Sequence, residues 1–417
     1  MQQHKIYPVI FILFINISII TLDNAHFYRA TSFWFEPRLE KKGLTSLDVN
    51  IQTGSTQKGQ DYKGQQSNIL NIYGKYNMHK LGCGIESVEK RKTPNAIILD
   101  NLCKVESQNC SFGELLFSGK FNITEAQLNL YQNIANGFFI QIFVPIRKLG
   151  INKISYTDQT QDKNNPEWQA FLNNFQNILS EYQLSICPTD QSGFGDSTLA
   201  VGWTWSNENT DMLDFIDSTI EIGLLMPTGK QQSTKKVFSM PLGYNGHWGT
   251  YLSFSLGIGI YDWITFGTHI DSIFFASKLK NTRLKTDICQ SGMIKLGTDF
   301  ARIEKEPIWN LALFAKADHM IKGLSFWLGY TKSIKYEDNV IPRNSNIYPK
   351  TIVNSDLELS GWESNTINLG LEYDFSKEKY LAGLRIGGFA NIPFGGKKCF
   401  LTSMVGISTG LDLAWKF

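Results

Sequence analysis

Six charged or titratable side chains lie on stretches in which apolar and polar residues alternate. They are Glu221, His269, Asp271, Glu372, Asp374 and Arg385. Each occupies a position opposite a row of apolar residues, so a strand through it would turn the polar group to one face and the apolar chains to the other. Such groups on one interior face can bind the polar part of a ligand, or can pair with one another as a salt-bridged ladder. Both interpretations are open from the sequence.

A serine offers a second kind of chemistry. The run Gly195-Asp196-Ser197-Thr198-Leu199 resembles the signature of serine esterases whose nucleophile follows Gly-Asp. That signature is accompanied by a later Asp-x-x-His pair, and no such pair follows Ser197. His269 and Asp271 would have to activate the serine instead. We therefore expect no enzyme activity, and interpret Asp196 as the entry to a strand.

The cysteines predict no metal centre. They stand at positions 83, 103, 110, 187, 289 and 399, without a C-x-x-C pair or a nearby histidine cluster. The chain also lacks a phosphate-binding loop and a dinucleotide fingerprint, so no cofactor is expected. Cys103 and Cys110 are close enough in sequence to staple one loop, although six cysteines allow 15 pairings. The alternative is that most of them are free and buried.

Composition narrows the class of protein. Charged residues make up 19% and aromatic residues 13%, and the formal net charge is only +2, which gives no basic field for nucleic acid. The longest apolar run, Ile6 to Ile20, follows Lys5 and precedes Ala25. It predicts a secretory signal peptide over residues 1–25, with a retained anchor helix as the alternative.

The remaining residues, 26–417, carry repeated strand patterns. In the last segment Val405, Ile407, Thr409, Leu411 and Leu413 share one face, as lipid-facing residues of a membrane strand would. Similar rows begin near positions 138, 199, 220, 252, 264, 309, 324, 367 and 384. They predict an all-β fold, a transmembrane antiparallel β-barrel of about 14 strands, with 12 to 16 possible. Further strands are expected at 44–53, 68–76, 81–88 and 114–132.

The end of the chain predicts where the barrel is inserted. Its alternating residues are Leu411, Leu413, Trp415 and Phe417. This resembles the C-terminal signal by which outer-membrane proteins are recognised by their insertion machinery. The resemblance implies the bacterial outer membrane as the location, with its lipids and that machinery as partners.

The lengths of the gaps between the predicted strands indicate which connections are short turns and which are long loops. Barrels of this kind alternate short inner turns with long outer loops, and Asn136-Gly137 is a strong signal for a two-residue turn. Residues 278–307 must be one outer loop or a loop with a strand pair. The long outer loop 148–193 contains an amphipathic helix at 165–182, whose apolar stripe includes Trp168, Phe171 and Phe175. This helix is either a lid over the barrel mouth or a loop helix packed on its neighbours.

One tract carries a family resemblance. The runs GFGDSTLAVGWTW, IEIGLLMPTGK and YLSFSLGIGIYDW between residues 193 and 275 resemble the barrel family linked to the meta pathway of phenol degradation. That family is similar to outer-membrane transporters of long-chain fatty acids and aromatic hydrocarbons. The resemblance implies passive uptake of small hydrophobic or aromatic solutes. A structural or adhesive surface barrel is the alternative, and a membrane esterase is less favoured.

Overall fold

The computed structural model describes residues 28–31, 43–89, 92–105, 112–208, 213–260, 263–321, 323–375 and 382–415. The expected signal peptide, Cys110 and Phe417 lie outside these residues, and the side chain of Trp415 is likewise not described.

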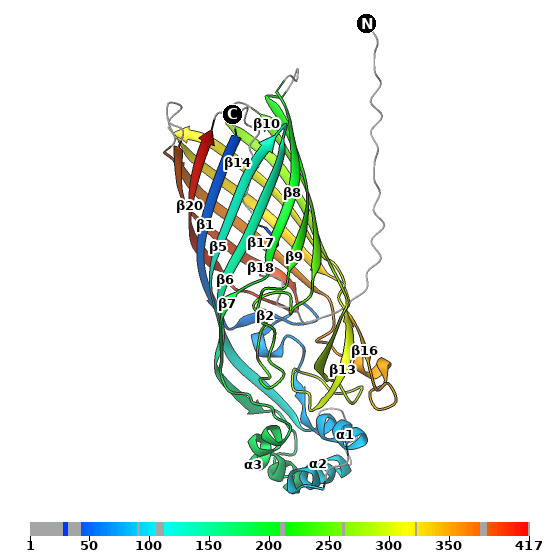
Figure 1. The fold of residues 1–417 in the computed structure, drawn as a ribbon. Coiled ribbons are helices and arrows are strands. Elements are labelled where there is room, and N and C mark those ends of the chain that lie inside the picture. Colours follow the sequence, from blue (N-terminus) through cyan, green and yellow to red (C-terminus); the bar gives the residue numbers. More distant parts are fainter. Residues whose placement is uncertain are drawn as a thin grey trace.

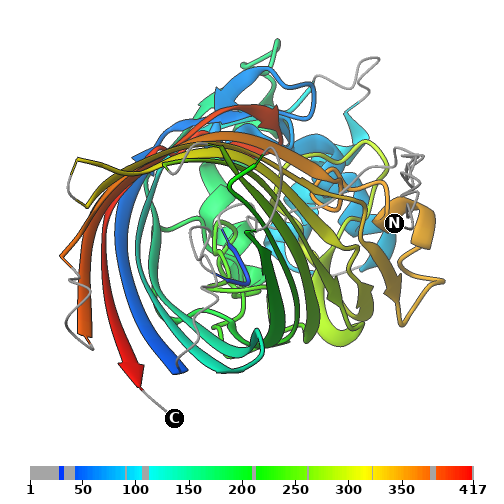
Figure 2. The same ribbon diagram turned by 90° about the horizontal axis from the view of Figure 1, so that it is seen from above.

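Twelve antiparallel strands close into a barrel, because β5 pairs with β1 on one side and with β6 on the other (Figures 1 and 2). In chain order the barrel strands are β1 (Gly43–Thr56), β5 (Glu114–Ala135), β6 (Phe138–Asp158), β8 (Ser197–Asn207), β9 (Phe215–Met226), β10 (Gly249–Ile260), β11 (Ile264–Phe275), β14 (Ile308–Ile321), β15 (Leu324–Lys335), β17 (Trp362–Asp374), β18 (Ala382–Lys397) and β20 (Met404–Trp415). Two short strands, β4 (Tyr76–Asn77) and β7 (Thr189–Phe194), are bonded to β5 and β6 outside the closed ring. The sheet thus has fourteen strands, twelve of which form the barrel.

The two faces of the strands differ as the alternation predicts. On β8, Leu199, Val201 and Trp203 are exposed on the outer surface, whereas Ala200 and Thr204 are buried. Most residues of the rows predicted on β9, β10, β14 and β20 are likewise exposed, Ile407 to 60%. Large apolar side chains exposed all around a closed sheet would be unfavourable in water. In a bilayer the same side chains face hydrocarbon. The prediction of an all-β barrel of the outer-membrane type is confirmed.

The turn at Asn136-Gly137 forms as expected between β5 and β6. Both residues have positive φ, 51° and 84°, which is the conformation of a two-residue hairpin turn matching the twist of its strands. It lies at the same end of the barrel as the C-terminal end of β20 (Figure 1). We call this the short-turn end.

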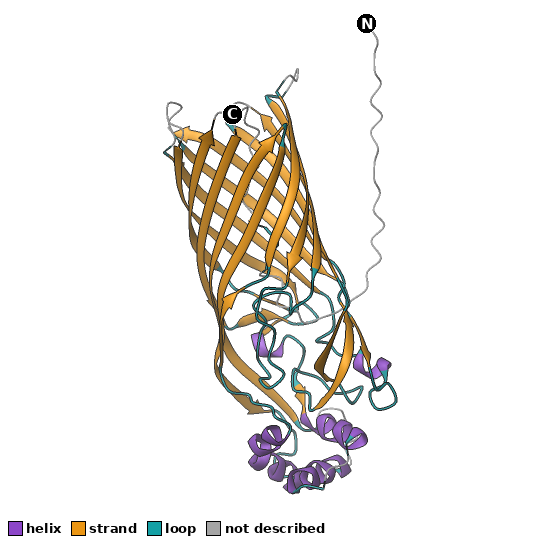
Figure 3. Cartoon of the chain, viewed as in Figure 1, coloured by secondary structure: helices purple, strands orange, loops and turns teal. Residues whose placement is uncertain are grey.

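The opposite end of the barrel bears a head made from the long connections, and all the α-helices lie there (Figure 3). The helices are α1 (Met78–Val88), α2 (Pro94–Lys104), α3 (Pro166–Glu181) and α4 (Lys350–Val353), with a 3-10 turn, η2, at Ile69–Asn71. Two three-stranded sheets complete the head, one of β12 (Lys278–Leu284), β13 (Gly297–Glu304) and β16 (Asn339–Pro342), the other of β19 (Cys399–Phe400), β2 (Lys58–Gln60) and β3 (Gln66–Asn68). Residues 278–307 therefore contain a strand pair, one of the two expected arrangements.

No helix within the described residues combines the length and the apolar character needed to cross a membrane.

Two strand predictions near the N-terminus are wrong. Residues 68–76 run from the last residue of β3 through η2 to the first residue of β4. The side chain of Asn68 ends the strand and caps η2 by accepting a hydrogen bond from the Leu70 N–H. Residues 81–88 are helical, in α1, where the Asn77 side chain caps the helix by accepting from the Lys80 N–H. Side chains that bond to the backbone in this way favour caps over strands.

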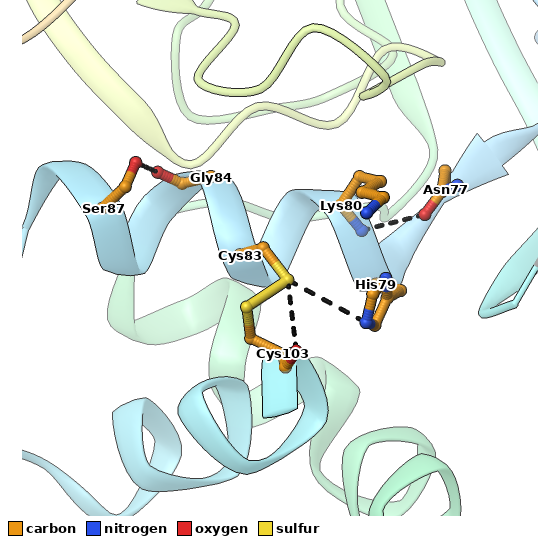
Figure 4. The surroundings of a disulfide bond; sticks show 7 residues. All are labelled: Asn77, His79, Lys80, Cys83, Gly84, Ser87 and Cys103. Carbon is orange, nitrogen blue, oxygen red and sulfur yellow. Dashed lines mark hydrogen bonds between the residues drawn. A yellow bond between two sulfur atoms is a disulfide. The ribbon is translucent and has the colours of Figure 1, made fainter. Parts of the chain in front are cut away.

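A disulfide between Cys83 and Cys103 joins α1 to α2, with their Cα atoms 4.8 Å apart (Figure 4). A pairing of Cys103 with Cys110, one of the possibilities that the sequence left open, is excluded because Cys103 is bonded to Cys83. The cause is the packing of two consecutive helices, which brings cysteines 20 positions apart together. Of the free cysteines, Cys187 and Cys289 are exposed and Cys399 is buried.

Helix α3 begins where capping chemistry allows it. Asn165 accepts hydrogen bonds from the N–H groups of Glu167 and Trp168, and Pro166 stands in the first turn, where no N–H partner is needed. Glu181 at its far end bonds to α2, accepting from Thr93 at 2.7 Å and from Asn95 at 2.8 Å. The disulfide thus links α1 to α2, and these hydrogen bonds link α2 to α3.

Candidate functional site

Two segments of the chain fold into the barrel and narrow its lumen. The first is Tyr28–Thr31, which lies inside the ring of strands in Figure 2. The second is the stretch 239–244 of the β9–β10 connection, all of which is buried. The segments touch, since the Tyr28 hydroxyl donates to the Pro241 carbonyl, and Thr31 shares a hydrogen bond of 2.9 Å with Tyr251 of β10. We call these two segments together the lumen constriction.

A buried ion pair anchors the constriction to the wall. Arg147 of β6 donates from Nε to Glu125 of β5 at 2.7 Å, and both side chains are at most 1% exposed. The guanidinium also donates from Nη1 to the Leu242 carbonyl at 2.7 Å, and it lies 4.0 Å above the Tyr28 ring. One cation therefore contacts the wall and both segments of the constriction. Gln52 of β1 supports Glu125 by donating to its second oxygen at 2.6 Å.

Asp196 forms a second anchor of the constriction, close to Arg147 in the barrel wall. It lies between β7 and β8, where the Gly195 N–H still bonds to the Pro145 carbonyl of β6. Its carboxylate accepts from the backbone N–H of Gly229 at 2.7 Å and of Tyr244 at 2.5 Å. A Cβ on Gly243 would come within 2.6 Å of three atoms of this carboxylate, so the close approach requires glycine there. Asp196 thus stands directly before β8, and its carboxylate binds the connection between β9 and β10.

Three of the six predicted interior groups form one network. Glu221 accepts from Ser253 at 3.2 Å, and Asp271 accepts from Asn310 at 2.7 Å. His269 contacts Asp271 through Nε2 at 3.3 Å and bonds Ser255 through Nδ1 at 2.8 Å. The register explains the grouping, because Ser253 stands opposite Glu221 on one side and Asp271 on the other.

Arg385 and Glu372 form the second network. Arg385 of β18 pairs with Asp48, Asp412 and Glu372 at 2.7, 3.0 and 3.4 Å. One cation thus faces three carboxylates drawn from β1, β20 and β17. Each of these interior groups has an ion-pair or hydrogen-bond partner, which lowers the cost of burying it. Asp374 of β17 is the register partner of Arg385, near the short-turn end, and its backbone N–H donates to the Gly323 carbonyl at 2.9 Å.

Sequence reasoning did not single out Glu125, Arg147, Asp48 or Asp412. A signal for Arg147 was present, since Phe139, Gln141 and Phe143 precede it on the same face of the strand and all are buried. Continuing the alternation through Pro145 would have placed Arg147 inside. Its contact with Leu242 joins strands to a loop 95 positions away, and no local pattern encodes that contact.

Ser197 has no catalytic arrangement of the kind considered from the sequence. Its hydroxyl lies 3.1 Å from the Thr228 hydroxyl, and Thr228 in turn donates to the Gly195 carbonyl at 2.6 Å. The histidine that would have served it bonds Ser255 instead. The serine thus takes part in the turn that leaves β9.

The proposed lid residues all lie in the core of the head. Trp168, Phe171 and Phe175 are at most 1% exposed. The Trp168 indole donates to Asp158 at 3.0 Å, and Phe175 packs edge-on against Tyr156, both on the extension of β6. These contacts are those of a helix packed on its neighbours. Whether α3 also controls entry stays a prediction.

The wall around the constriction is apolar toward the head. Leu225, Tyr251, Ile273 and Ile308 are all buried on the inner side of their strands. Tyr244 of the constriction packs on Phe275 with ring centroids 5.2 Å apart, and Tyr28 packs edge-on against Tyr244 at 6.0 Å. The inside of the barrel therefore presents aromatic and aliphatic surface at this level, whereas the charged groups described above lie elsewhere on its inner face.

The described residues contain no group of three or more histidine, cysteine or carboxylate side chains that could hold a metal ion. Of the predicted assembly residues, Leu411 and Leu413 are each 40% exposed on the outer face of β20.

No protein-family model matches the chain, and no curated protein matches it either. Among solved structures it is similar to an outer membrane channel from Pseudomonas putida F1, with 10% identity, a TM-score of 0.48, and 91% of this chain and 98% of that one covered. It is also similar to a Pseudomonas aeruginosa FadL homologue, with 10% identity, a TM-score of 0.32, and coverage of 96% and 100%. The Pseudomonas putida toluene transporter TodX matches with 9% identity, a TM-score of 0.29, and coverage of 96% and 95%.

Proposed function

We propose that this chain is an outer-membrane channel for passive uptake of small hydrophobic or aromatic solutes. The observation that carries the proposal is the lumen constriction, in which Tyr28 and Tyr244 meet an inner wall of Tyr251 and Ile273. A barrel that serves only as a wall or an anchor needs no such apolar surface inside, at the head end of a potential route. A pore for hydrophilic solutes would need a continuous polar path instead.

The anchors of the constriction suit a segment that moves aside. They are a small number of polar contacts, chiefly those of Arg147 and Asp196, rather than a covalent link or a strand added to the sheet. Displacing the 239–244 stretch would expose the apolar wall to solute without breaking the barrel. The paired charges of Glu221, His269, Asp271 and Arg385 would then line the remaining polar part of the lumen.

Uptake by intact cells tests the proposal, since the outer leaflet that slows apolar solutes is present there. Initial rates for labelled phenol, naphthalene and glucose would be compared between cells that carry the gene and cells that lack it. We expect faster entry of phenol and naphthalene and unchanged entry of glucose. Equal acceleration of glucose would indicate a general pore and would contradict the proposal.

Conductance of the purified protein in a planar bilayer distinguishes a channel from the remaining alternative, a structural or adhesive barrel. A channel with a movable constriction should show conductance events, whereas a structural or adhesive barrel should show none. If both the uptake difference and the conductance are missing, the alternative of a surface barrel without transport is favoured.

A further inference from the structure

The head contains a cavity of about 530 Å³ that is separate from the interior charge networks of the barrel. Its walls come from four stretches of the chain, together with Leu184 and Asn245. The stretches are residues 231–237 of the β9–β10 connection, residues 280–285 on and just after β12, residues 293–305 around β13, and residues 338–359 around α4. The sheet of β12, β13 and β16, which forms one side, lies beyond the end of the barrel in Figure 1.

Positive charge dominates the cavity lining. Seven lysine and arginine side chains line it, against three carboxylates. The carboxylates already have cationic partners. Lys295 contacts both Asp356 and Glu358, and Asp338 pairs at 2.9 Å with Lys335, which does not line the cavity. The lining therefore keeps an excess of four positive charges.

Two of the cations are held by uncharged partners. Arg283 donates to the carbonyl oxygens of Thr234, Leu296 and Tyr182 at 3.0, 2.8 and 2.7 Å. Lys285 is 4% exposed, and its ammonium donates to the Ser355 carbonyl at 3.0 Å. Burial lowers the pKa of Lys285. Carbonyls fix these side chains in place but do not cancel their charge. Asp356 offsets the charge of Lys285 only in part, so an anion in the cavity would lower the cost of burying both cations further.

The rest of the lining is aliphatic. Leu184, Val237, Met293, Val340 and Val353 face the same space. An inorganic anion would satisfy the cations but would leave this surface unused. A neutral hydrocarbon would do the reverse. The combination of a cationic wall and an apolar wall in a space of this size matches a small molecule with an anionic head and an apolar body.

We propose that this cavity binds small organic carboxylates with an apolar body, in the manner of benzoate. The site goes beyond the proposed channel function, because it lies in the head and its occupation is an equilibrium property that needs no flux. Lys235 and Lys236, both exposed at the edge of the cavity, attract the carboxylate, and the aliphatic side chains cover the ring.

Equilibrium dialysis of labelled benzoate against the full chain in an uncharged detergent tests the proposal. Benzamide has nearly the same shape without the charge and is the matched ligand. We expect saturable benzoate binding with one site per chain, at least about tenfold weaker binding of benzamide, and weakening of benzoate binding by added salt. Equal binding of the two ligands would overturn the proposal.

Variants locate the site. In Lys235→Gln/Lys236→Gln, two exposed lysines are replaced without loss of a buried contact, and we expect benzoate to bind about tenfold more weakly. Lys104→Gln/Lys148→Gln is the control, since it removes the same charge from side chains that are 68% and 64% exposed and do not line the cavity. An equal loss in both variants would overturn the proposal, because it would show a general effect of charge.

Competition by inorganic phosphate decides the ligand class. Phosphate should displace benzoate only at much higher concentration, since it cannot use the aliphatic wall. Displacement at an equal concentration would overturn the assignment to organic carboxylates. Failure of any of these binding tests leaves the uptake of phenol and naphthalene unaffected, so the two proposals can fail separately.

Discussion

Arg385 of β18 and Asp48 of β1 form an ion pair of 2.7 Å across the strand that separates them. That strand is β20, and Gly410 stands on it directly opposite both residues. A Cβ at Gly410 would lie 2.7 Å from Arg385 Nη2 and 2.7 Å from Asp48 Oδ1. The missing side chain of Gly410 is therefore what allows the two charges to meet.

Gly410→Ala is expected to destabilise the barrel. The added methyl must push the guanidinium and the carboxylate apart, at a cost of about 1 to 3 kcal/mol for overpacking. Urea unfolding in detergent, followed by tryptophan fluorescence, would measure the change. Gly388→Ala on β18 is the control, because its Cβ would meet nothing closer than 3.7 Å. Equal midpoints for the two variants would show that the ion pair does not depend on Gly410.

Removing one partner of the Arg147–Glu125 pair should be costly, because both side chains are fully enclosed and the remaining charge would lose the counterion to which it is hydrogen-bonded. We expect Arg147→Met to reduce the free energy of unfolding by about 3 to 5 kcal/mol. The double variant Arg147→Met/Glu125→Met should recover much of that loss. A double variant as unstable as the single one would mean that Arg147 stabilises through Leu242 and Tyr28 rather than through Glu125.

Asp196→Asn tests the hold on the 239–244 stretch. Asparagine offers one acceptor oxygen in place of two, so either the Gly229 or the Tyr244 N–H loses its partner. A hydrogen bond to a charged group contributes about 1.5 to 3 kcal/mol, and its loss should favour displacement of the constriction. We expect higher channel conductance and faster amide exchange at Tyr244.

Asp190→Asn is the matched control for this change. Asp190 lies on β7, a few residues before Asp196, but its side chain is 63% exposed and it pairs with Lys148 at 3.2 Å on the surface. A surface pair of this kind contributes little. Conductance that rises equally in both variants would show that Asp196 does not anchor the constriction in the way proposed.

The role of α3 can be tested through Phe171. Phe171→Ala should lower the stability of the head by about 3 to 5 kcal/mol, because a large buried side chain is removed. If α3 is only a packed helix, the uptake rate of phenol should stay within about twofold at temperatures where the head remains folded. A rise in uptake under those conditions would support the lid interpretation.

The sequence predicted those parts of the structure that depend on residues close to one another along the chain. The alternation from Leu199 to Trp205 identified the lipid-facing side of β8 because lipid and lumen are opposite solvents for successive residues. The turn at Asn136-Gly137 followed from backbone geometry alone. Pairs such as Ser253 with Glu221 required only the correct register between adjacent strands.

The head and the constriction depend on contacts between distant segments. Cys83 bonds Cys103 because two helices pack together; the first of them, α1, lies in a region that was predicted as a strand, and the second, α2, in a region for which no element was predicted. Arg147 reaches Leu242, and Tyr28 reaches Pro241 over 213 positions. The alternation predicts which side chains of a strand face the inside of the barrel. It does not predict which loop contacts those side chains.

Lys398 predicts a pH dependence of stability. It lies in the connection between β18 and β19 and is 4% exposed, and its ammonium has no hydrogen-bond partner among the described residues. Burial lowers the pKa of Lys398 to about 7, with the charge of Glu337 only partly offsetting this effect. In the unfolded chain the lysine stays protonated up to its ordinary pKa near 10.5, so between these values the unfolded state binds more protons.

The sign follows from that difference in bound protons. Stability should rise as the pH increases from about 7 toward about 10, and the cost of burying the charged lysine should be fully present below pH 7. Lys398→Met should remove this slope and stabilise the head most at acidic pH. Lys397→Met, at the exposed neighbouring position, is the control. Urea midpoints measured from pH 6 to pH 10 for the parent and both variants provide the test, and a slope that persists in Lys398→Met would assign the titration to another group.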